Sequence, residues 1–366
     1  MKSFHSIAYF AQHEGIGHFY HYHCAVQKAM SQILKDVSVY VPQNADFANM
    51  PSGWKKWFSP FYNRRSRKKF WKECVQLFRQ PASHSRVFFI EFFGRRDFVL
   101  YALAALLFGR KHDAFWVLYR DDLTIRRKKD LKTIRFFSKL LKWKYQTRFL
   151  PLTDSELLAD YYQKWFGAKP TVLPVLYAHY RPIQMEHKEK LVCTWLGNPR
   201  PEKGANEIAR LVQVLDPAAE KITLDVSGAT YFPPVKNLIN IRLRKAFLSE
   251  EEYYAALSQS DIVLLPYDPQ KYQRRTSGVF VEAILAGKIP LVKEGSWLAH
   301  ELKRFHLHEL IINWDDPHFF THLLSLHQDQ KMLTKLQAMQ QAYLAFHGEV
   351  NFAQSLHALL GKGSTK

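Results

Sequence analysis

The stretch from Asp261 to Val292 constrains the fold of this chain more than any other part of the sequence. It begins with an apolar run that Pro266 ends, which is typical of a buried strand, and a polar loop follows. Ser277 to Ala286 then has the pattern of a helix closed by Gly287, and Ile289 to Val292 is a second apolar strand. This order predicts a βαβ unit, whose ligand lies beyond the carboxyl end of the first strand, at the helix N-terminus.

The loop ahead of this helix carries residues suited to an anionic ligand. Arg274 and Arg275 bring two guanidinium groups to the start of the helix. Glu282 follows inside the helix, where its carboxylate can accept hydrogen bonds from sugar hydroxyls. Cations and free helical amides beside an acid predict a sugar-nucleotide site, whereas the alternative is an ordinary βαβ unit with a solvated basic loop. The residues expected to surround the diphosphate with hydroxyls and amides are Thr276, Ser277, Gly278 and Val279.

The segment Ser-Gly-Val-Phe-Val-Glu-Ala-Ile-Leu-Ala-Gly-Lys-Ile-Pro-Leu-Val, residues 277–292, resembles the donor-binding segment of the group 1 glycosyltransferases, a retaining-type family with the GT-B fold. In that family a glycine turn precedes a Glu-Ala-x-x-x-Gly-x-Pro-x-Val run, and Glu282, Gly287 and Pro290 fall in register with it. The family usually has another Glu eight positions before the one that matches Glu282, and this chain has Arg274 there. The resemblance therefore implies a nucleotide-diphospho-sugar donor, without the contact that this earlier Glu makes.

A second segment, residues 191–204, is similar to the Gly-Arg-Leu-x-x-x-Lys-Gly motif of the same family, which Gly197, Lys203 and Gly204 match. Asn198 stands where the family has an Arg. Lys203 is either part of this basic motif or simply a lysine at a helix start.

The resemblance also implies roles for these residues. Lys203, Glu282 and Arg274 are expected to be catalytic, with the cations meeting the charge that grows on the departing diphosphate. We expect Arg274 and Arg275 to supply the charge that Asn198 lacks. The family holds the nucleotide base at a loop that Phe247 matches, largely through backbone groups, so the sequence does not indicate which base is bound.

A chain of 366 residues is long enough for two domains, and strand and helix patterns alternate throughout it. The predicted fold is α/β, with two doubly wound parallel-sheet (Rossmann-like) domains facing across a cleft, as in the GT-B type. We expect an acceptor-binding domain at 1–178, a polar linker at 179–190 and a nucleotide-sugar-binding domain at 191–348. Residues 349–366 are predicted to form a helix that crosses back to the first domain, followed by a frayed tail.

The sequence gives fewer signals for the residues that bind the acceptor. Gly15 and Gly17 form a short turn between a predicted first strand at Ser6 to Ala11 and the helix after it, where backbone amides could face the donor or where the chain simply turns. Arg120 comes directly after a predicted strand, at the edge where ligands bind in parallel sheets. The complete set of acceptor-side candidates is His13, Glu14, His18, Arg120 and Asp121.

Positive charge is concentrated in the first half of the chain. The net charge is +19, and residues 1–180 hold 30 Lys and Arg against 13 Asp and Glu, whereas residues 181–366 hold 22 against 20. Aromatic and basic residues interleave without an acid from Trp54 to Lys72, which suits docking on an anionic membrane and thus a lipid-linked or envelope glycan acceptor. The alternatives are a solvated basic face with its aromatics in the core, and a nucleic-acid site.

No cofactor or metal is expected. Three scattered cysteines and histidines without ligand spacing predict no metal site and a reducing compartment. No apolar run is long enough to span a bilayer, so the expected location is cytoplasmic, at the inner face of a membrane. We interpret the chain as a metal-independent glycosyltransferase. The rival hypotheses are a catalytically silent sugar-nucleotide-binding protein of the same fold and a protein that binds nucleic acid through its basic first half.

Overall fold

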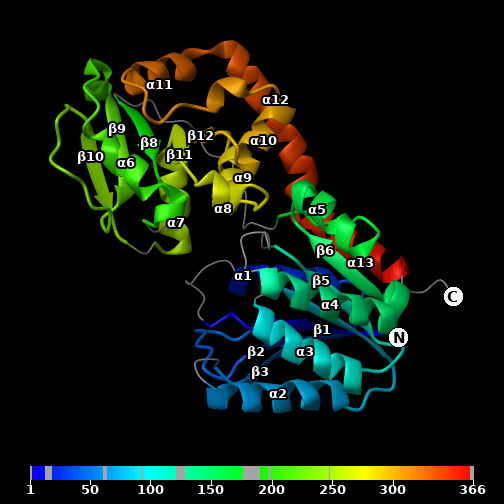
Figure 1. Cartoon of the computed structure of the whole chain (residues 1–366). Coiled ribbons are helices and arrows are strands. Elements are labelled where there is room, and N and C mark those ends of the chain that lie inside the picture. Colours follow the sequence, from blue (N-terminus) through cyan, green and yellow to red (C-terminus); the bar gives the residue numbers. More distant parts are fainter. Residues whose placement is uncertain are drawn as a thin grey trace. The chain divides into compact units, whose positions relative to one another are not determined.

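The computed structural model describes residues 2–12, 19–60, 64–91, 94–120, 128–175, 190–196, 199–246 and 248–362 (Figure 1). The chain divides into two compact units, the first made of 1–177 with 347–366 and the second of 178–346. Each contains one parallel β-sheet, which confirms the predicted fold class of two Rossmann-like α/β units.

The first unit is built on a seven-stranded sheet in the order β3-β2-β1-β4-β5-β6-β7. Every neighbouring pair is parallel, and the order reverses beside β1, as in doubly wound folds. The strands are β1 (Lys2–Ile7), β2 (Asp36–Pro42), β3 (Trp54–Phe58), β4 (Ser85–Glu91), β5 (Ala114–Leu118), β6 (Phe149–Thr153) and β7 (Thr171–Val172).

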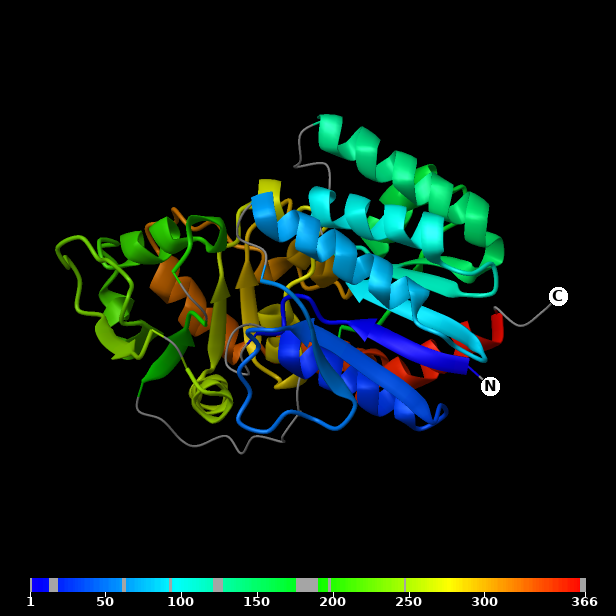
Figure 2. The ribbon, with the colours of Figure 1, turned by 90° about the horizontal axis from the view of Figure 1, so that it is seen from below.

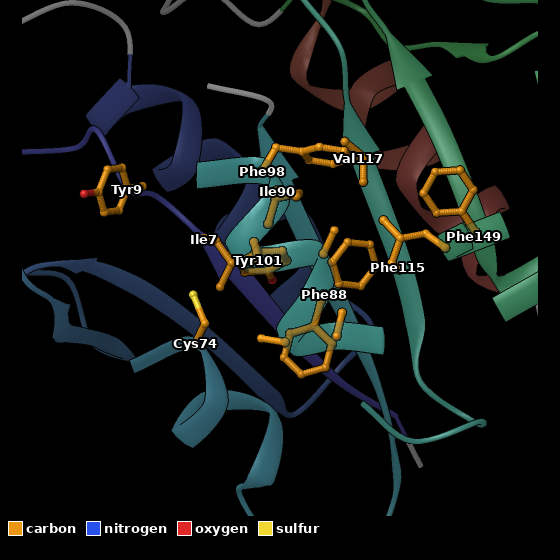
Figure 3. Packing of buried hydrophobic residues seen from close by; sticks show 14 of the residues in the cluster. Ile7, Tyr9, Cys74, Phe88, Ile90, Phe98, Tyr101, Phe115, Val117 and Phe149 are labelled. Carbon is orange, nitrogen blue, oxygen red and sulfur yellow. The ribbon is translucent and has the colours of Figure 1, made fainter. Parts of the chain in front are cut away.

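Helices cover both faces of this sheet. One face carries α2 (Arg64–Arg79), α3 (Arg95–Phe108), α4 (Lys128–Tyr145) and α5 (Glu156–Phe166), while the other carries α1 (Phe19–Ser31) and α13 (Glu349–Lys362). The core under α2–α5 is rich in aromatic side chains, among them Phe88, Tyr101, Phe115 and Phe149 (Figure 3), and the ring centres of Tyr101 and Phe115 lie 5.2 Å apart. Rings at 5–6 Å separations, such as Phe115 and Tyr145 at 5.8 Å, give this core large buried area and fixed geometry.

The C-terminal helix α13 belongs to the first unit and lies beside α1 (Figure 2). Phe352, Leu356 and Leu359 enter the core beneath it. Polar contacts fix its position, since Glu349 pairs with Lys28 at 2.6 Å and the Lys2 ammonium donates to the Leu360 carbonyl at 2.9 Å.

The second unit has a five-stranded parallel sheet in the order β10-β9-β8-β11-β12. Its strands are β8 (Leu191–Thr194), β9 (Ile222–Ser227), β10 (Asn240–Arg244), β11 (Ile262–Leu265) and β12 (Ile289–Val292). The predicted βαβ unit is present as β11, α9 (Gly278–Leu285) and β12. The remaining α-helices are α6 (Ala205–Leu211), α7 (Glu250–Gln259), α8 (Pro269–Tyr272), α10 (Trp297–Arg304), α11 (Phe319–Gln328) and α12 (Gln330–His347).

The segment from Trp54 to Lys72 does not expose its described aromatic side chains for membrane insertion. It forms the edge strand β3 and the start of α2, and Trp54, Phe58 and Phe70 are buried. Trp57 packs against Tyr40 and donates to the Glu73 carbonyl. Insertion of these rings into a bilayer is therefore ruled out, because the sheet and α2 need them as core. Phe61 and Tyr62, which the same hypothesis includes, lie outside the described residues.

Candidate functional site

Two loops of the second unit meet where β8 and β11 end. Gly204 has φ +83°, and a Cβ there would lie 2.4 Å from the Pro266 carbonyl oxygen. The Asp268 amide donates to the Glu202 carbonyl at 3.0 Å, which fastens the loop after β11 to the loop after β8. Only glycine permits both this backbone angle and the close approach to Pro266. These two constraints explain why a glycine follows the lysine in the Lys-Gly motif.

Lys203 precedes this glycine, and its ammonium lies 5.7 Å from the centre of the Tyr267 ring. Among the described residues, the Lys203 ammonium has no hydrogen-bond or ion-pair partner. Burial lowers its pKa, and the cations Arg200 and Arg275 lower it further against the opposing effect of Tyr272. A half-buried ammonium with cations nearby and no carboxylate bound to it among the described residues suits an anionic ligand.

Two tyrosine rings lie beside the basic side chains of Lys203 and Arg275. Tyr267 and Tyr272 have ring centres 4.5 Å apart, and the Arg275 guanidinium lies 5.4 Å from the Tyr272 ring. Burial raises the pKa of Tyr267 to about 12, so its phenol stays neutral and adds no charge at neutral pH. Arg275 is exposed, so its guanidinium can reach a ligand from the solvent side.

The start of α9 completes the site. Thr276 and Ser277 are buried, and Ser277 caps the helix by accepting a hydrogen bond from the Phe280 amide at 3.3 Å. Gly278 and Val279 are the first helical residues, where backbone N–H groups lack partners within the helix. Their amides and the helix dipole favour an anion at this end.

Glu282 lies one turn into α9, where it accepts a hydrogen bond from the Tyr253 hydroxyl of α7. Burial raises the pKa of Tyr253 well above its usual value, and the Glu282 carboxylate raises it further. The tyrosine therefore remains a donor and orients the carboxylate. Arg274 is placed differently from Arg275, since its guanidinium donates to the Gln273 side chain at 2.8 Å.

Several predicted residues lie outside the described part of the chain. They are His13, Glu14, Gly15, Gly17, His18, Asp121, Gly197, Asn198 and Phe247.

In the first unit, Arg120 joins the carboxyl ends of three adjacent strands. It follows β5, and its guanidinium donates to Glu91 of β4 at 3.1 Å and to Asp154, just after β6, at 2.7 Å. The guanidinium also lies 5.2 Å from the Tyr22 ring. Both carboxylates are buried, so one cation is set against two anions at the edge where ligands of parallel sheets bind.

Sequence reasoning missed residues of both groups, namely Arg200, Tyr253, Tyr267, Tyr272, Glu91 and Asp154. A signal existed for Arg200, which stands two residues after the Asn198 that replaces the family arginine. Glu91 and Asp154 lie within two residues of the ends of the predicted strands Arg86 to Phe92 and Arg148 to Leu152, and parallel strands bring such ends together. Tyr253 gave no signal, because its contact joins two helices far apart in sequence.

A cavity of about 570 Å³ lies elsewhere in the second unit, past the end of β12, and none of the predicted donor residues lines it. Its cations have acidic partners, as in Lys293 with Glu207 and Lys303 with Glu294. We place the candidate site at Lys203 instead, where the ammonium has no acidic partner within the described ranges, although Arg200 beside it pairs with Glu202 at 3.3 Å. Across the described ranges, no group of three or more His, Cys, Asp or Glu could hold a metal ion, and no helix is long and apolar enough to cross a membrane.

No family model matches the chain, and no curated protein matches it. Several solved structures match the chain over almost its whole length. A sucrose-phosphate synthase from Thermosynechococcus elongatus superposes with a TM-score of 0.69 at 11% identity, covering 99% of each chain. A glycosyltransferase from Rickettsia africae gives 0.65 at 8% identity over 100% of this chain and 99% of its own. An α-glucosyltransferase, solved with UDP-glucose and DNA containing an abasic site, gives 0.57 at 11% identity, with 100% and 99% covered.

The chain has the GT-B fold. At identities of 8–12%, such likeness establishes the architecture and not the chemistry. In the GT-B fold of this chain, the second unit carries the cationic group at the β8 and β11 ends, and the first unit carries the Arg120 group at the ends of β4, β5 and β6.

Proposed function

We propose that this protein is a glycosyltransferase that moves a sugar from a nucleotide-diphospho-sugar to an acceptor hydroxyl. The observation that carries the proposal is the half-buried Lys203 ammonium without an anionic partner among the described residues, close to Arg200 and Arg275 in a GT-B unit. A diphosphate would neutralise these cations and accept hydrogen bonds from the α9 amides. The Glu282 carboxylate, oriented by Tyr253, would accept hydrogen bonds from sugar hydroxyls of the donor.

The chemistry assigned to these residues is stabilisation of the leaving group. When the bond between the sugar carbon and the diphosphate oxygen breaks, negative charge grows on that oxygen. Lys203, Arg275 and the amides of Gly278 and Val279 would meet this charge without having to reorganise. Two GT-B neighbours support such a donor, since these α-glucosyltransferases were solved in complex with UDP-glucose and with UDP.

For the acceptor we propose a lipid-linked or envelope glycan, bound by the first unit. The Arg120 group offers two carboxylates that can accept hydrogen bonds from hydroxyls. The hydrogen bonds from the Arg120 guanidinium hold these carboxylates in place. The high positive charge of residues 1–180 suits an acceptor displayed on an anionic surface, which places the enzyme peripherally at the inner face of a membrane.

The direct test is a panel of radiolabelled sugar nucleotides, incubated with the purified protein and followed for hydrolysis and for transfer to an extract of glycolipids. One donor should be consumed in preference to the rest, with label appearing in the lipid phase. Tight binding of a sugar nucleotide with neither hydrolysis nor transfer would instead identify a silent binding protein. Failure to bind any donor would contradict the assignment of the site.

Activity is expected to survive EDTA. The diphosphate site already holds cationic side chains and a helix N-terminus, which do the work that a divalent ion does elsewhere. Initial rates with and without chelator, and after adding Mg²⁺ or Mn²⁺, provide the measurement. Complete loss of turnover with EDTA, restored by either ion, would show that a metal shares the site.

Replacing Arg274 and Arg275 with alanine together should weaken UDP binding roughly ten- to a hundredfold, since a charge-assisted hydrogen bond contributes about 1.5–3 kcal/mol. Uridine lacks the phosphates and should lose little affinity. Isothermal titration measures both ligands, with GDP and guanosine as the alternative pair. Because Arg275 rather than Arg274 lies on Tyr272 beside Lys203, Arg275→Ala should account for most of the loss. Equal losses for diphosphate and nucleoside would refute a phosphate contact.

A further inference from the structure

Helix α4 of the first unit exposes two large aromatic side chains. Trp143 is 77% exposed and Phe136 is 56% exposed, whereas Ile134, Leu141 and Tyr145 of the same helix are buried in the core. The helix is therefore firmly seated by its inner face, and its outer aromatics are not needed for packing. Exposing them to water has a free-energy cost that packing does not explain.

These aromatics lie in line with lysines. At 100° per residue, Lys132, Phe136, Lys139 and Trp143 fall within an arc of about 60° on the helix surface and span about 16 Å along its axis. Lys129 and Arg135 flank this line and are exposed. We call these six residues the α4 outer face. It alternates cation and aromatic ring along one straight line.

The α4 outer face carries no acidic residue. The one acid of the helix, Asp130, pairs with Arg95 of α3 at 2.9 Å. Lys144 points elsewhere, because its ammonium donates to the carbonyls of Ala105, Leu106 and Gly109 at the end of α3. The lysines of the outer face have no such partners among the described residues, so their charge is available to a large anionic surface.

Further positive charge lies on the same side of the sheet. Helices α2, α3 and α4 form one layer there, with α3 packed against both of the others. Figure 1 shows the three helices side by side. Exposed basic residues continue the charge onto α2, α3 and the loop after α3, namely Lys68, Lys69, Lys72, Arg79, Arg96 and Arg110.

We infer that the α4 outer face docks the protein on an anionic lipid bilayer. Phe136 and Trp143 would enter the headgroup layer while the lysines between them contact lipid phosphates, an arrangement that interfacial helices use. This inference rests on the proposed function and deepens it, since it assigns the contact with the acceptor's membrane to α4 instead of Trp54 to Lys72. A nucleic acid would also meet the charge. However, two exposed aromatic rings set in line with lysines along the outer face of one helix suit a flat interface better than separate bases.

The experiment is co-sedimentation of the full-length protein with vesicles of phosphatidylcholine alone or mixed with phosphatidylglycerol. The protein should bind only the anionic vesicles, and less as salt rises. A variant with Phe136→Ser and Trp143→Ser, and another with Lys132→Gln and Lys139→Gln, should each lose about tenfold or more in vesicle affinity. The matched control is Tyr231→Ser with Leu238→Ser, which removes side chains 85% and 74% exposed in the second unit and should bind as wild type.

Circular dichroism of each variant confirms that the fold is kept. Equal binding to neutral vesicles, unchanged binding of both α4 variants, or preferential binding of duplex DNA added as a competitor would overturn the inference. Donor hydrolysis by the α4 variants, measured without membranes, should remain at the wild-type level. Loss of vesicle binding with hydrolysis intact supports the docking surface. Absence of hydrolysis in every protein, with vesicle binding intact, would count against the proposed function alone.

Discussion

Replacing Lys203 with methionine should lower kcat/KM by on the order of 10²–10³, the usual effect of removing one preorganised donor to a developing negative charge. Methionine preserves the length and apolar contacts of the lysine stem. The variant thus loses the ammonium beside Tyr267 and little else. Steady-state kinetics with the preferred donor measure the effect, and most of it should fall on kcat, because the charge on the diphosphate grows in the transition state.

Lys236→Met is the control for this variant. It removes an exposed lysine of the same unit and should leave kcat/KM unchanged. If Lys203→Met retained kcat/KM within a few-fold of wild type, Lys203 would not be a catalytic residue.

The stability of the same variant should move in the opposite direction. Burial lowers the folded-state pKa of Lys203 below its ordinary value, so keeping the ammonium charged opposes folding at neutral pH. That cost is present below the lowered pKa and is relieved as pH rises from there toward the unfolded value. Lys203→Met should therefore unfold at a denaturant concentration equal to or above that of wild type. A clear fall in the midpoint would mean that Lys203 stabilises the fold.

Gly204→Ala should destabilise the second unit by about 2–5 kcal/mol. A left-handed backbone angle costs a non-glycine residue about 1–2 kcal/mol. The new Cβ would also clash with the Pro266 ring and carbonyl at 2.4 Å, and such overpacking typically costs about 1–3 kcal/mol. Denaturant unfolding followed by tryptophan fluorescence gives the midpoint. The clash would also displace Lys203 from Tyr267, so activity should fall in the protein that remains folded.

Gly295→Ala separates the two contributions. This glycine of the same unit has a similar φ of +79°, but its Cβ would meet only Pro269 at 3.4 Å. It should show the backbone cost with little clash. If both alanine variants lost the same free energy of unfolding, the clash at the close approach of the two loops at Gly204 would not contribute to the destabilisation.

The sequence predicted the βαβ unit well because its signals are local. Ile289–Val292 was predicted with the bounds that β12 has, and the predicted helix start at Ser277 is the capping residue of α9. Hydrophobic runs and caps depend on neighbouring residues alone, so they can be read from one chain. The first strand was placed too late, at Ser6 to Ala11 instead of Lys2–Ile7, because its polar Ser3, His5 and Ser6 hide a buried strand.

The same difference between local signals and long-range contacts applies to the candidate site. Lys203 and Glu282 stood in recognisable motifs, but their partners are contributed by other elements. Tyr253 reaches Glu282 from α7, and Glu91 and Asp154 reach Arg120 from neighbouring strands. Such contacts depend on sheet order and helix packing, which composition and spacing do not determine.

The membrane hypothesis shows how composition alone can mislead. Aromatic side chains of the same types lie in both segments. Those of Trp54, Phe58 and Phe70 are buried, whereas those of Phe136 and Trp143 are exposed. A local mixture of rings and cations does not say which side chains face inward. The helical period of α4 does so, once the buried face of the helix is known.

The placement of α13 in the first unit has a consequence for how the protein is made. Residues 1–177 supply the sheet, but Phe352, Leu356 and Leu359 complete one of its faces. A ribosome synthesises the whole second unit before it adds these three side chains. The first unit therefore waits with one face of its sheet only partly covered, by α1 without α13, and its packing is completed only after translation of the second unit.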